Sequence, residues 1–201
     1  MRFSTKLPVV AMSGLLMVAV SAAEARAPQE STAPAAAATP NPAVGGAAMD
    51  AAKPITENAA AAPNLTTLVK AVKAAGLDAT LSGPGPFTVF APTNDAFGRL
   101  AAGTVDTLMK PENKATLVKV LTYHVVPGII TLEQLKQKMT AGGGTTTLTT
   151  VEGATLTVTD LNGAIQLTDA NGNKSYVEVP DVRQSNGVVH VVNGVLLPKL
   201  G

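Results

Sequence analysis

The sequence predicts an α+β domain in which helices come first and strands come later. Between residues 54 and 144, apolar side chains recur at helical spacing and are bounded by capping residues. Between residues 145 and 201, short β-branched or alternating runs are separated by Asn-Gly turn signals. Helices that precede strands, instead of alternating with them, are typical of an α+β fold and argue against a parallel α/β sheet.

The first 27 residues have the layout of a cleavable export signal. A basic start is followed by an almost continuously apolar stretch over residues 7–22 and by an Ala-x-Ala cleavage pattern at residues 25–27. The apolar stretch is about 16 residues long, shorter than the roughly 20 that a membrane-spanning helix needs. Cleavage is expected before Pro28, or two residues earlier, before Arg26. We therefore expect export to the periplasm, the cell surface or the medium, with no membrane insertion after cleavage.

Removing the signal changes the charge balance of the chain. Residues 1–27 take three basic and one acidic residue from totals of 15 and 14, which leaves 12 basic and 13 acidic residues and a net charge of −1. Nucleic acid is not an expected partner, because no window after residue 27 supplies the basic patch that phosphate binding needs. The chain has no cysteine, so its core must hold the domain together without disulfides.

Residues 28–53 are expected to be a disordered linker. Ala, Pro, Thr, Asn and Gly dominate this region, and Val44 and Met49 are its only sizeable apolar residues. Two such residues bury too little surface to offset the entropy of ordering the chain. The linker is either a spacer that holds the domain away from a surface or a passive tail left by cleavage. The remaining residues, 54–201, have the length of a single domain.

Capping residues define the expected helices. Asn64 can cap a helix that ends before Gly76, a residue suited to the position after a helix C-terminus. Thr93 is expected to cap a second helix, and Thr131 to form a capping box with Gln134 at a third. Shorter helical patterns lie over residues 104–109 and 111–121.

Strands are expected at seven places, and two Asn-Gly pairs mark hairpin turns between them at residues 162–163 and 171–172. In the second of these strands, Tyr123 and His124 would face opposite sides. The expected strands cover residues 87–90, 123–126, 145–150, 154–159, 164–168, 175–179 and 188–197.

Three sequence blocks resemble the signature of the fasciclin (FAS1) domain family. They are TVFAPTNDAF at residues 88–97, the Tyr-His pair within LTYHVVPG at 123–124, and NGVVHVVNGVLLP at 186–198. Their order and spacing match the family over about residues 54–200. The resemblance, to the secreted bacterial single-domain type, implies a β-sandwich or wedge with several short helices packed against it. It also implies an extracellular or envelope location and a role in adhesion or matrix contact.

The resemblance also implies a candidate adhesion surface, made of Tyr123, His124, Pro180, Asp181 and Val182. The Tyr-His pair is either structural or in direct contact with a ligand. Pro180-Asp181-Val182 stands where animal matrix proteins of the family carry a Pro-Asp-Ile sequence linked to integrin binding, with Val182 in place of isoleucine. An exposed Asp181 could complete a metal-dependent receptor site, or it could be an ordinary turn residue.

The residues typical of enzymes and metal sites are not assembled in this sequence. The only histidines are His124 and His190, and the chain has no Cys nucleophile and no G-x-S-x-G turn. His190 lies between valines and is expected to be a hydrogen-bonded core residue. Residues 169–173 resemble a calcium loop, but Lys174 occupies the place of the required glycine, so a hairpin turn is expected. We expect no catalysis, no cofactor and no bound metal.

These observations lead to two expected function classes. The first is non-catalytic adhesion or interaction with extracellular matrix or a surface, through a cell-surface or matrix protein or polymer. The alternative is a periplasmic protein that binds or scaffolds a small apolar ligand or an envelope polymer.

Overall fold

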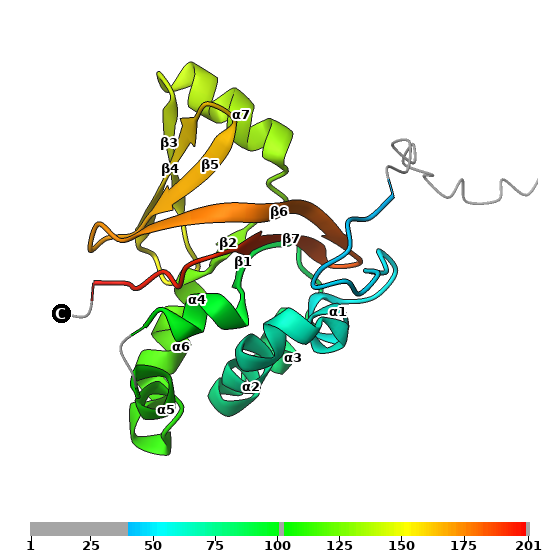
Figure 1. The fold of residues 1–201 in the computed structure, drawn as a ribbon, viewed down its shortest axis with the longest axis vertical. Coiled ribbons are helices and arrows are strands. Elements are labelled where there is room, and N and C mark those ends of the chain that lie inside the picture. The colour runs from blue at the N-terminus through cyan, green and yellow to red at the C-terminus, as the bar shows by residue number, and fades with distance from the viewer. Residues whose placement is uncertain (1–39, 101–102, 200–201) are drawn as a thin grey trace, which may run out of the picture. The chain divides into compact units, whose positions relative to one another are not determined.

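The computed structural model describes residues 40–100 and 103–199. The expected signal at 1–27 and the first part of the expected linker, 28–39, lie outside the described residues. Within the described residues, helices cover a bent sheet of seven strands (Figure 1). This arrangement is α+β, as predicted. The strands are β1 (Phe87–Pro92), β2 (Val125–Pro127), β3 (Thr145–Thr149), β4 (Thr155–Leu161), β5 (Ala164–Thr168), β6 (Lys174–Gln184) and β7 (Gly187–Val192).

Most helices precede the strands of the second half, and only one follows β2. The α-helices are α1 (Ile55–Ala61), α2 (Thr66–Ala75), α3 (Asp78–Leu81), α4 (Asn94–Gly98), α5 (Thr104–Leu108), α6 (Lys114–Tyr123) and α7 (Leu132–Ala141). Two short 3₁₀ helices precede α2 and α6. Helix α7 lies beside β3, β4 and β5, while the other helices lie on the opposite side of β1 and β7 (Figure 1). None of the helices in the described ranges has the length and apolar character needed to cross a membrane.

The sheet bends because the two halves of β6 pair with different strands. The strand order is β2-β1-β7-β6-β5-β4-β3, with β1 and β7 parallel and all other neighbours antiparallel. The first part of β6 pairs with β5 and the second with β7, and register shifts between residues 177 and 182 separate the two parts. The far ends of the sheet approach each other, because the N–H of Val151 donates to the carbonyl of Val125 at 2.8 Å. The result is a nearly closed barrel.

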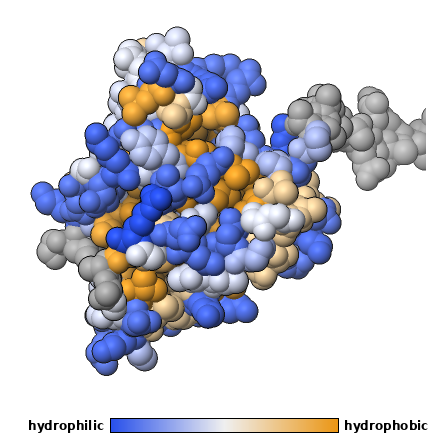
Figure 2. Space-filling view, in the orientation of Figure 1, coloured by the Kyte–Doolittle hydropathy of each residue, from blue (hydrophilic) through white to orange (hydrophobic). Residues whose placement is uncertain are grey.

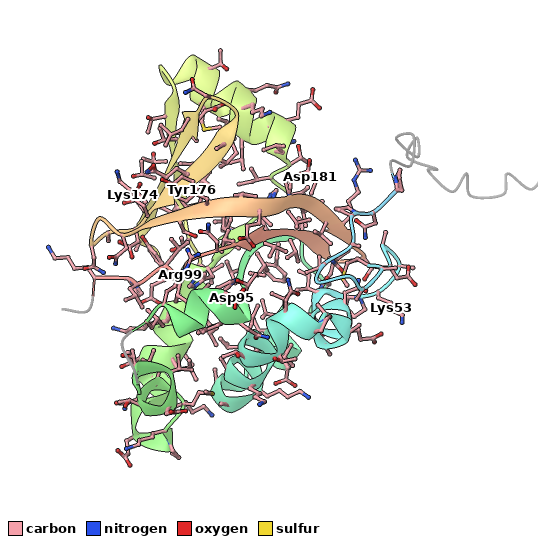
Figure 3. All side chains as sticks on the ribbon, in the orientation of Figure 1. Lys53, Asp95, Arg99, Lys174, Tyr176 and Asp181 are labelled. Atoms are coloured by element: carbon pink, nitrogen blue, oxygen red, sulfur yellow. The ribbon has the colours of Figure 1, made fainter. Side chains whose placement is uncertain are left out.

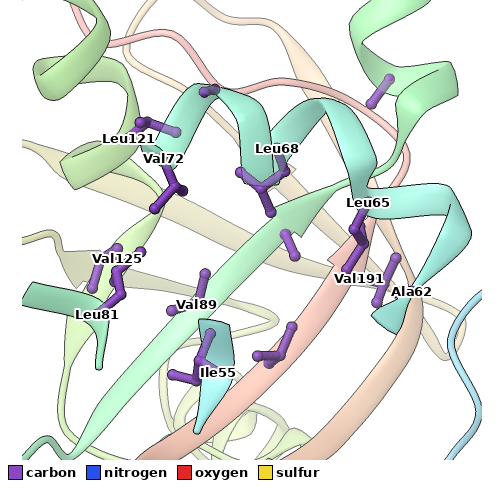
Figure 4. Packing of buried hydrophobic residues seen from close by; sticks show 14 of the residues in the cluster. Ile55, Ala62, Leu65, Leu68, Val72, Leu81, Val89, Leu121, Val125 and Val191 are labelled. Carbon is purple, nitrogen blue, oxygen red and sulfur yellow. The ribbon is translucent and has the colours of Figure 1, made fainter. Parts of the chain in front are cut away.

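Two hydrophobic cores use opposite faces of the central strands. In β1, Val89 and Ala91 belong to the core under helices α1, α2 and α6, whereas Phe90 belongs to the core beneath α7. In β7, Val191 and Val192 divide in the same way. Figure 4 shows the first core, in which side chains from the helices meet those of the strands. The central strands are therefore buried on both faces, which explains their continuous apolar sequence.

Residues 40–53 correct the expected linker, since they pack on the domain. Val44 is 1% exposed and Met49 is 7% exposed, both within the helix-side core. The Asn41 side-chain amide pairs with the main chain of Arg183, donating to its carbonyl at 2.8 Å and accepting from its N–H at 2.7 Å. Asn58 holds the main chain of Asp50 in the same manner. Two apolar residues suffice here because they complete a core that other elements already form.

The expected caps are mostly confirmed. Thr93 accepts from Ala96 N–H at 3.3 Å, Thr131 forms its capping box, and Gly76 ends α2 with a φ of +73°. Asn64 is not a cap, because a 3₁₀ turn precedes α2 and the helix begins at Thr66.

The expected strand at residues 123–126 is wrong in its first half. Helix α6 continues through Tyr123, His124 ends it, and β2 begins only at Val125. The side chains of α6 already pack at helical spacing on the core, so the β-branched sequence that follows does not shorten the helix. Strand β6 also continues past its predicted end at 179, and β7 ends at Val192 instead of residue 197.

Candidate functional site

Tyr123 joins three parts of the fold through its hydroxyl group. The side chain is fully buried at the end of α6. Its hydroxyl donates to the carbonyl of Thr155 at 2.9 Å and accepts from the N–H of Ala170 at 3.1 Å. Burial raises the pKa of this phenol. Tyr123 therefore connects α6 to β4 and to the β5–β6 turn, and it offers no surface to a partner.

His124 is buried as a neutral imidazole with both ring nitrogens occupied. Nδ1 lies 2.7 Å from the carbonyl of Val120 and must donate, while Nε2 accepts from the N–H of Leu196 at 3.0 Å. Burial lowers the pKa of His124 to about 4, and the nearby Asp169 carboxylate offsets only part of that effect. Because neither nitrogen is free, His124 has none to bind a ligand or accept a proton from a substrate.

Asp169 organises the β5–β6 turn, for which the sequence predicts a hairpin turn and not a calcium loop. Its Oδ1 accepts from the N–H groups of Asn171 and Asn173, at 2.9 and 2.8 Å. Its Oδ2 accepts from the Asn173 side chain and from the N–H of Leu197, each at 2.9 Å. The hairpin interpretation is confirmed, and the carboxylate is saturated by N–H donors. Among the described residues, no three His, Asp or Glu side chains gather as a metal site would require.

His190 is confirmed as a hydrogen-bonded core residue. It lies on β7 and stacks on Phe90 of β1, with ring centroids 5.5 Å apart. Its Nδ1 accepts from the N–H of Asp181 at 3.2 Å, and its Nε2 donates to the carbonyl of Ile130 at 2.8 Å. Burial lowers the pKa of His190, against the opposing effect of Asp181. His190 thus ties β6 to the loop between β2 and α7.

Asp181 holds the same loop from the other direction. It lies at the irregular part of β6, near the point where the chain enters α7 (Figure 3), and its φ of +55° is in the left-handed region that Asp tolerates. Its Oδ1 accepts from the N–H of Leu132, the first residue of α7, at 2.7 Å. A carboxylate at a helix N-terminus is favourable because the helix dipole is positive there. The Asp181 carboxylate therefore supports the fold, and the residue is also partly exposed.

The loop at residues 128–131 is fixed at several points and presents one apolar side chain. The hydroxyl of Thr88 donates to the carbonyl of Gly128 at 2.7 Å and accepts from the N–H of Ile130 at 2.9 Å. Between these two anchored residues, Ile129 is 50% exposed. Ile129 is not among the site residues that the sequence predicts. The signal that could have identified it is the Pro-Gly pair before it, which marks a turn and so places an apolar residue on a loop.

The structure separates the five predicted site residues into two groups. Tyr123, His124 and Val182 are buried, so the expectation that they form an adhesion surface is wrong. Pro180 and Asp181 remain partly exposed. Asp181 contacts Leu132, three residues after the exposed Ile129, and His190 contacts both Asp181 and Ile130. We therefore group the three accessible residues near the start of α7 under one name, the Ile129 surface (Ile129, Pro180 and Asp181).

Comparison with known sequences identifies the domain. A sequence model of the fasciclin domain matches residues 63–198. Protein sll1483 of Synechocystis is 49% identical over 154 residues, which cover 77% of this chain and 78% of that protein. The immunogenic protein MPB70 of Mycobacterium bovis is 35% identical over 72% of this chain and 69% of its own length. The pig transforming growth factor-beta-induced protein ig-h3 is 36% identical over 131 residues, only 17% of its length.

A solved structure shows the same fold. The FAS1 domain pair of the insect cell adhesion molecule Fasciclin I superimposes with a TM-score of 0.63 at 19% sequence identity. The match covers 74% of this chain and 51% of that one. With three sequence blocks, a matching sequence model and a matching fold, the chain belongs to the fasciclin (FAS1) domain family.

Proposed function

We propose that this domain is a non-catalytic attachment module that contacts a surface or matrix polymer through the Ile129 surface. The observation that carries the proposal is the exposure of Ile129 on a loop whose neighbouring residues are held by Thr88, Asp181 and His190. An apolar side chain on a preorganised loop loses little conformational entropy when it binds. The description of Fasciclin I as a cell adhesion molecule supports the same class of function.

The buried polar groups support a function without catalysis. Both imidazoles of the chain use both ring nitrogens for main-chain hydrogen bonds. The carboxylate of Asp169 accepts four N–H donors, so it is not free to act as a base. General acid-base catalysis needs a titratable group within reach of a substrate proton, and these groups are committed to the fold.

Each single contact is expected to be weak. The Ile129 surface is small, and on the face drawn in Figure 2 the apolar areas are interrupted by hydrophilic side chains. The near-neutral charge of the chain gives little electrostatic steering. Attachment should therefore depend strongly on the number of copies displayed, because multivalent contacts multiply weak affinities.

The test is the attachment of beads that display the domain at graded density to cells of the source organism and to their purified envelope. Ile129→Ser should lower attachment about tenfold at equal density, since truncation of a central apolar contact typically costs more than 1 kcal/mol. The matched control is Leu161→Ser, because Leu161 is 44% exposed at the β4–β5 turn, away from this surface. Asp181→Asn is a second test that removes the charge but keeps an oxygen for Leu132 and tolerates the positive φ.

The outcomes separate the surface from the function. If Ile129→Ser and Asp181→Asn, each verified as folded, attach like the wild type, the Ile129 surface is the wrong surface. If the wild type attaches to neither cells nor envelope at the highest density, the attachment function itself is wrong.

A further inference from the structure

A cavity of about 60 Å³ lies between helices α1, α2 and α3 and strands β1, β6 and β7. Figure 4 shows side chains that surround it, including Ile55 from α1, Leu68 and Val72 from α2, and Val89 from β1. This volume exceeds the roughly 10–15 Å³ that a single water molecule needs. It lies in the helix-side core, so it is distinct from the Ile129 surface.

The polar side chains that line the cavity are already committed to other partners. The amide of Asn58 bonds to the main chain of Asp50 and to Gln184, and the hydroxyl of Thr56 lies 2.8 Å from that of Ser82. Both nitrogens of His124 are occupied as described. Within the described part of the chain, the one buried side-chain polar atom without a hydrogen bond belongs to Asn64, which does not line the cavity. Water needs two to four polar partners to be held in such a place, so the cavity favours an apolar guest.

The lining also restricts the shape of the guest. Apart from the committed polar groups and His124, the interior is formed by aliphatic side chains and one Met, with no Phe, Tyr or Trp. The exposed residues Lys73 and Asp78, of opposite charge, mark its outer edge. An aliphatic interior with a charge-balanced edge suits a flexible alkyl chain whose head group stays in water.

The N-terminal segment at residues 40–53 covers one side of this cavity. Val44 and Met49 are both lining residues, and the segment is fastened at each end by Asn41 on Arg183 and by Asp50 on Asn58. The lining is therefore incomplete without this segment, which gives the segment a role that its composition did not suggest.

We infer that the cavity is a binding site for a short unbranched alkyl chain, carried by a free amphiphile of medium chain length. The inference does not depend on the proposed attachment function, and each can fail without the other. It specifies the alternative class expected from the sequence, a protein that binds a small apolar ligand.

The experiment titrates the purified protein with 1-octanol and, separately, with sodium octanoate, while methyl NMR signals are recorded. The methyl groups of Leu68, Val72 and Val89 should shift in a saturable way, and the two probes should bind within about threefold of each other because the edge is charge-balanced. Ala59→Leu places three more carbons in the cavity and should weaken binding at least tenfold. Ala60→Leu is the matched control, because Ala60 is the next residue of α1, is exposed and does not line the cavity.

Three results would overturn the inference. The first is the absence of saturable shifts in the wild-type protein with either probe. The second is equal binding by Ala59→Leu and Ala60→Leu, which would place the probe elsewhere. The third is co-flotation with phosphatidylcholine vesicles without any response to 1-octanol or octanoate, which would assign the alkyl chain to a membrane lipid instead of a free amphiphile.

Discussion

Among single residues, Tyr123 and His124 have a structural role, because both are buried and bond to main-chain groups of other elements. The hydroxyl of Tyr123 satisfies one carbonyl and one N–H in β4 and the β5–β6 turn, and the imidazole of His124 does the same for α6 and the segment after β7. The two bonds of His124 are buried and the two bonds of Tyr123 are partly buried, so the loss of either side chain would leave main-chain groups without a partner at a cost in stability. The pair holds the two hydrophobic cores together.

Removal of the Tyr123 hydroxyl should therefore destabilise the domain. Tyr123→Phe leaves the Thr155 carbonyl and the Ala170 N–H without their partner, and we expect the free energy of unfolding to fall by about 1–3 kcal/mol. Tyr176→Phe is the matched control, because Tyr176 is 37% exposed and its hydroxyl makes one long contact of 3.4 Å. Urea unfolding of both variants measures the difference, and equal stability of the two would contradict the role given to Tyr123.

The buried histidines predict a loss of stability in acid. Above pH 6.5, His124 is neutral in both the folded and the unfolded chain. Between pH 6.5 and about 4, the imidazole binds a proton in the unfolded chain but not in the folded one, and this difference favours unfolding. The loss from His124 should reach about 3 kcal/mol at pH 4, and the lowered pKa of His190 acts in the same direction. Urea unfolding at pH 7.5, 5.5 and 4.5 measures it. His124→Asn should flatten this pH profile, and an unchanged profile would contradict the assignment.

At the scale of elements, short-range signals were predictable and long-range packing was not. The caps at Thr93 and Thr131 depend on residues within three positions, so the sequence shows them directly. The end of α6 at Tyr123 and the packing of residues 40–53 depend on partners far away along the chain, such as Thr155 and Arg183. Local sequence patterns do not identify such distant partners. For this reason the sequence alone predicts a strand at the Tyr-His pair and a linker at the N-terminal segment.

The packing of the N-terminal segment has a measurable consequence. Val44→Ala should lower the free energy of unfolding by about 1–3 kcal/mol, because it removes methyl groups from a buried core position. Val151→Ala is the matched control, since Val151 is 47% exposed, and it should change stability by less than about 0.5 kcal/mol. Thermal and urea unfolding compare the two variants. If they are equally stable, residues 40–53 do not belong to the core.

In the whole molecule, buried polar side chains such as Tyr123 and His124 hold the fold together, and the contact that we propose is left to residues that are at least partly exposed. The α+β class followed from the order of helical and strand patterns, and the structure confirms it. The family followed from three blocks of sequence, and the comparisons confirm it. The exposed surface that we propose for contact did not follow from the sequence, because three of the five predicted residues are buried in the core. Ile129 belongs to no sequence motif. It is exposed on a loop whose neighbouring residues are held by Thr88 of β1, Asp181 of β6 and His190 of β7.

We propose that the Tyr-His pair supports the fold and that the Ile129 surface makes the contact. The decisive experiment compares bead attachment of Tyr123→Phe and Ile129→Ser at equal density. The assay temperature is kept well below the unfolding temperature of each variant, so that both are fully folded. The account predicts that Tyr123→Phe attaches like the wild type although it is less stable, and that Ile129→Ser attaches about tenfold less although it is as stable. Wild-type attachment by Ile129→Ser together with lost attachment by folded Tyr123→Phe would contradict the account.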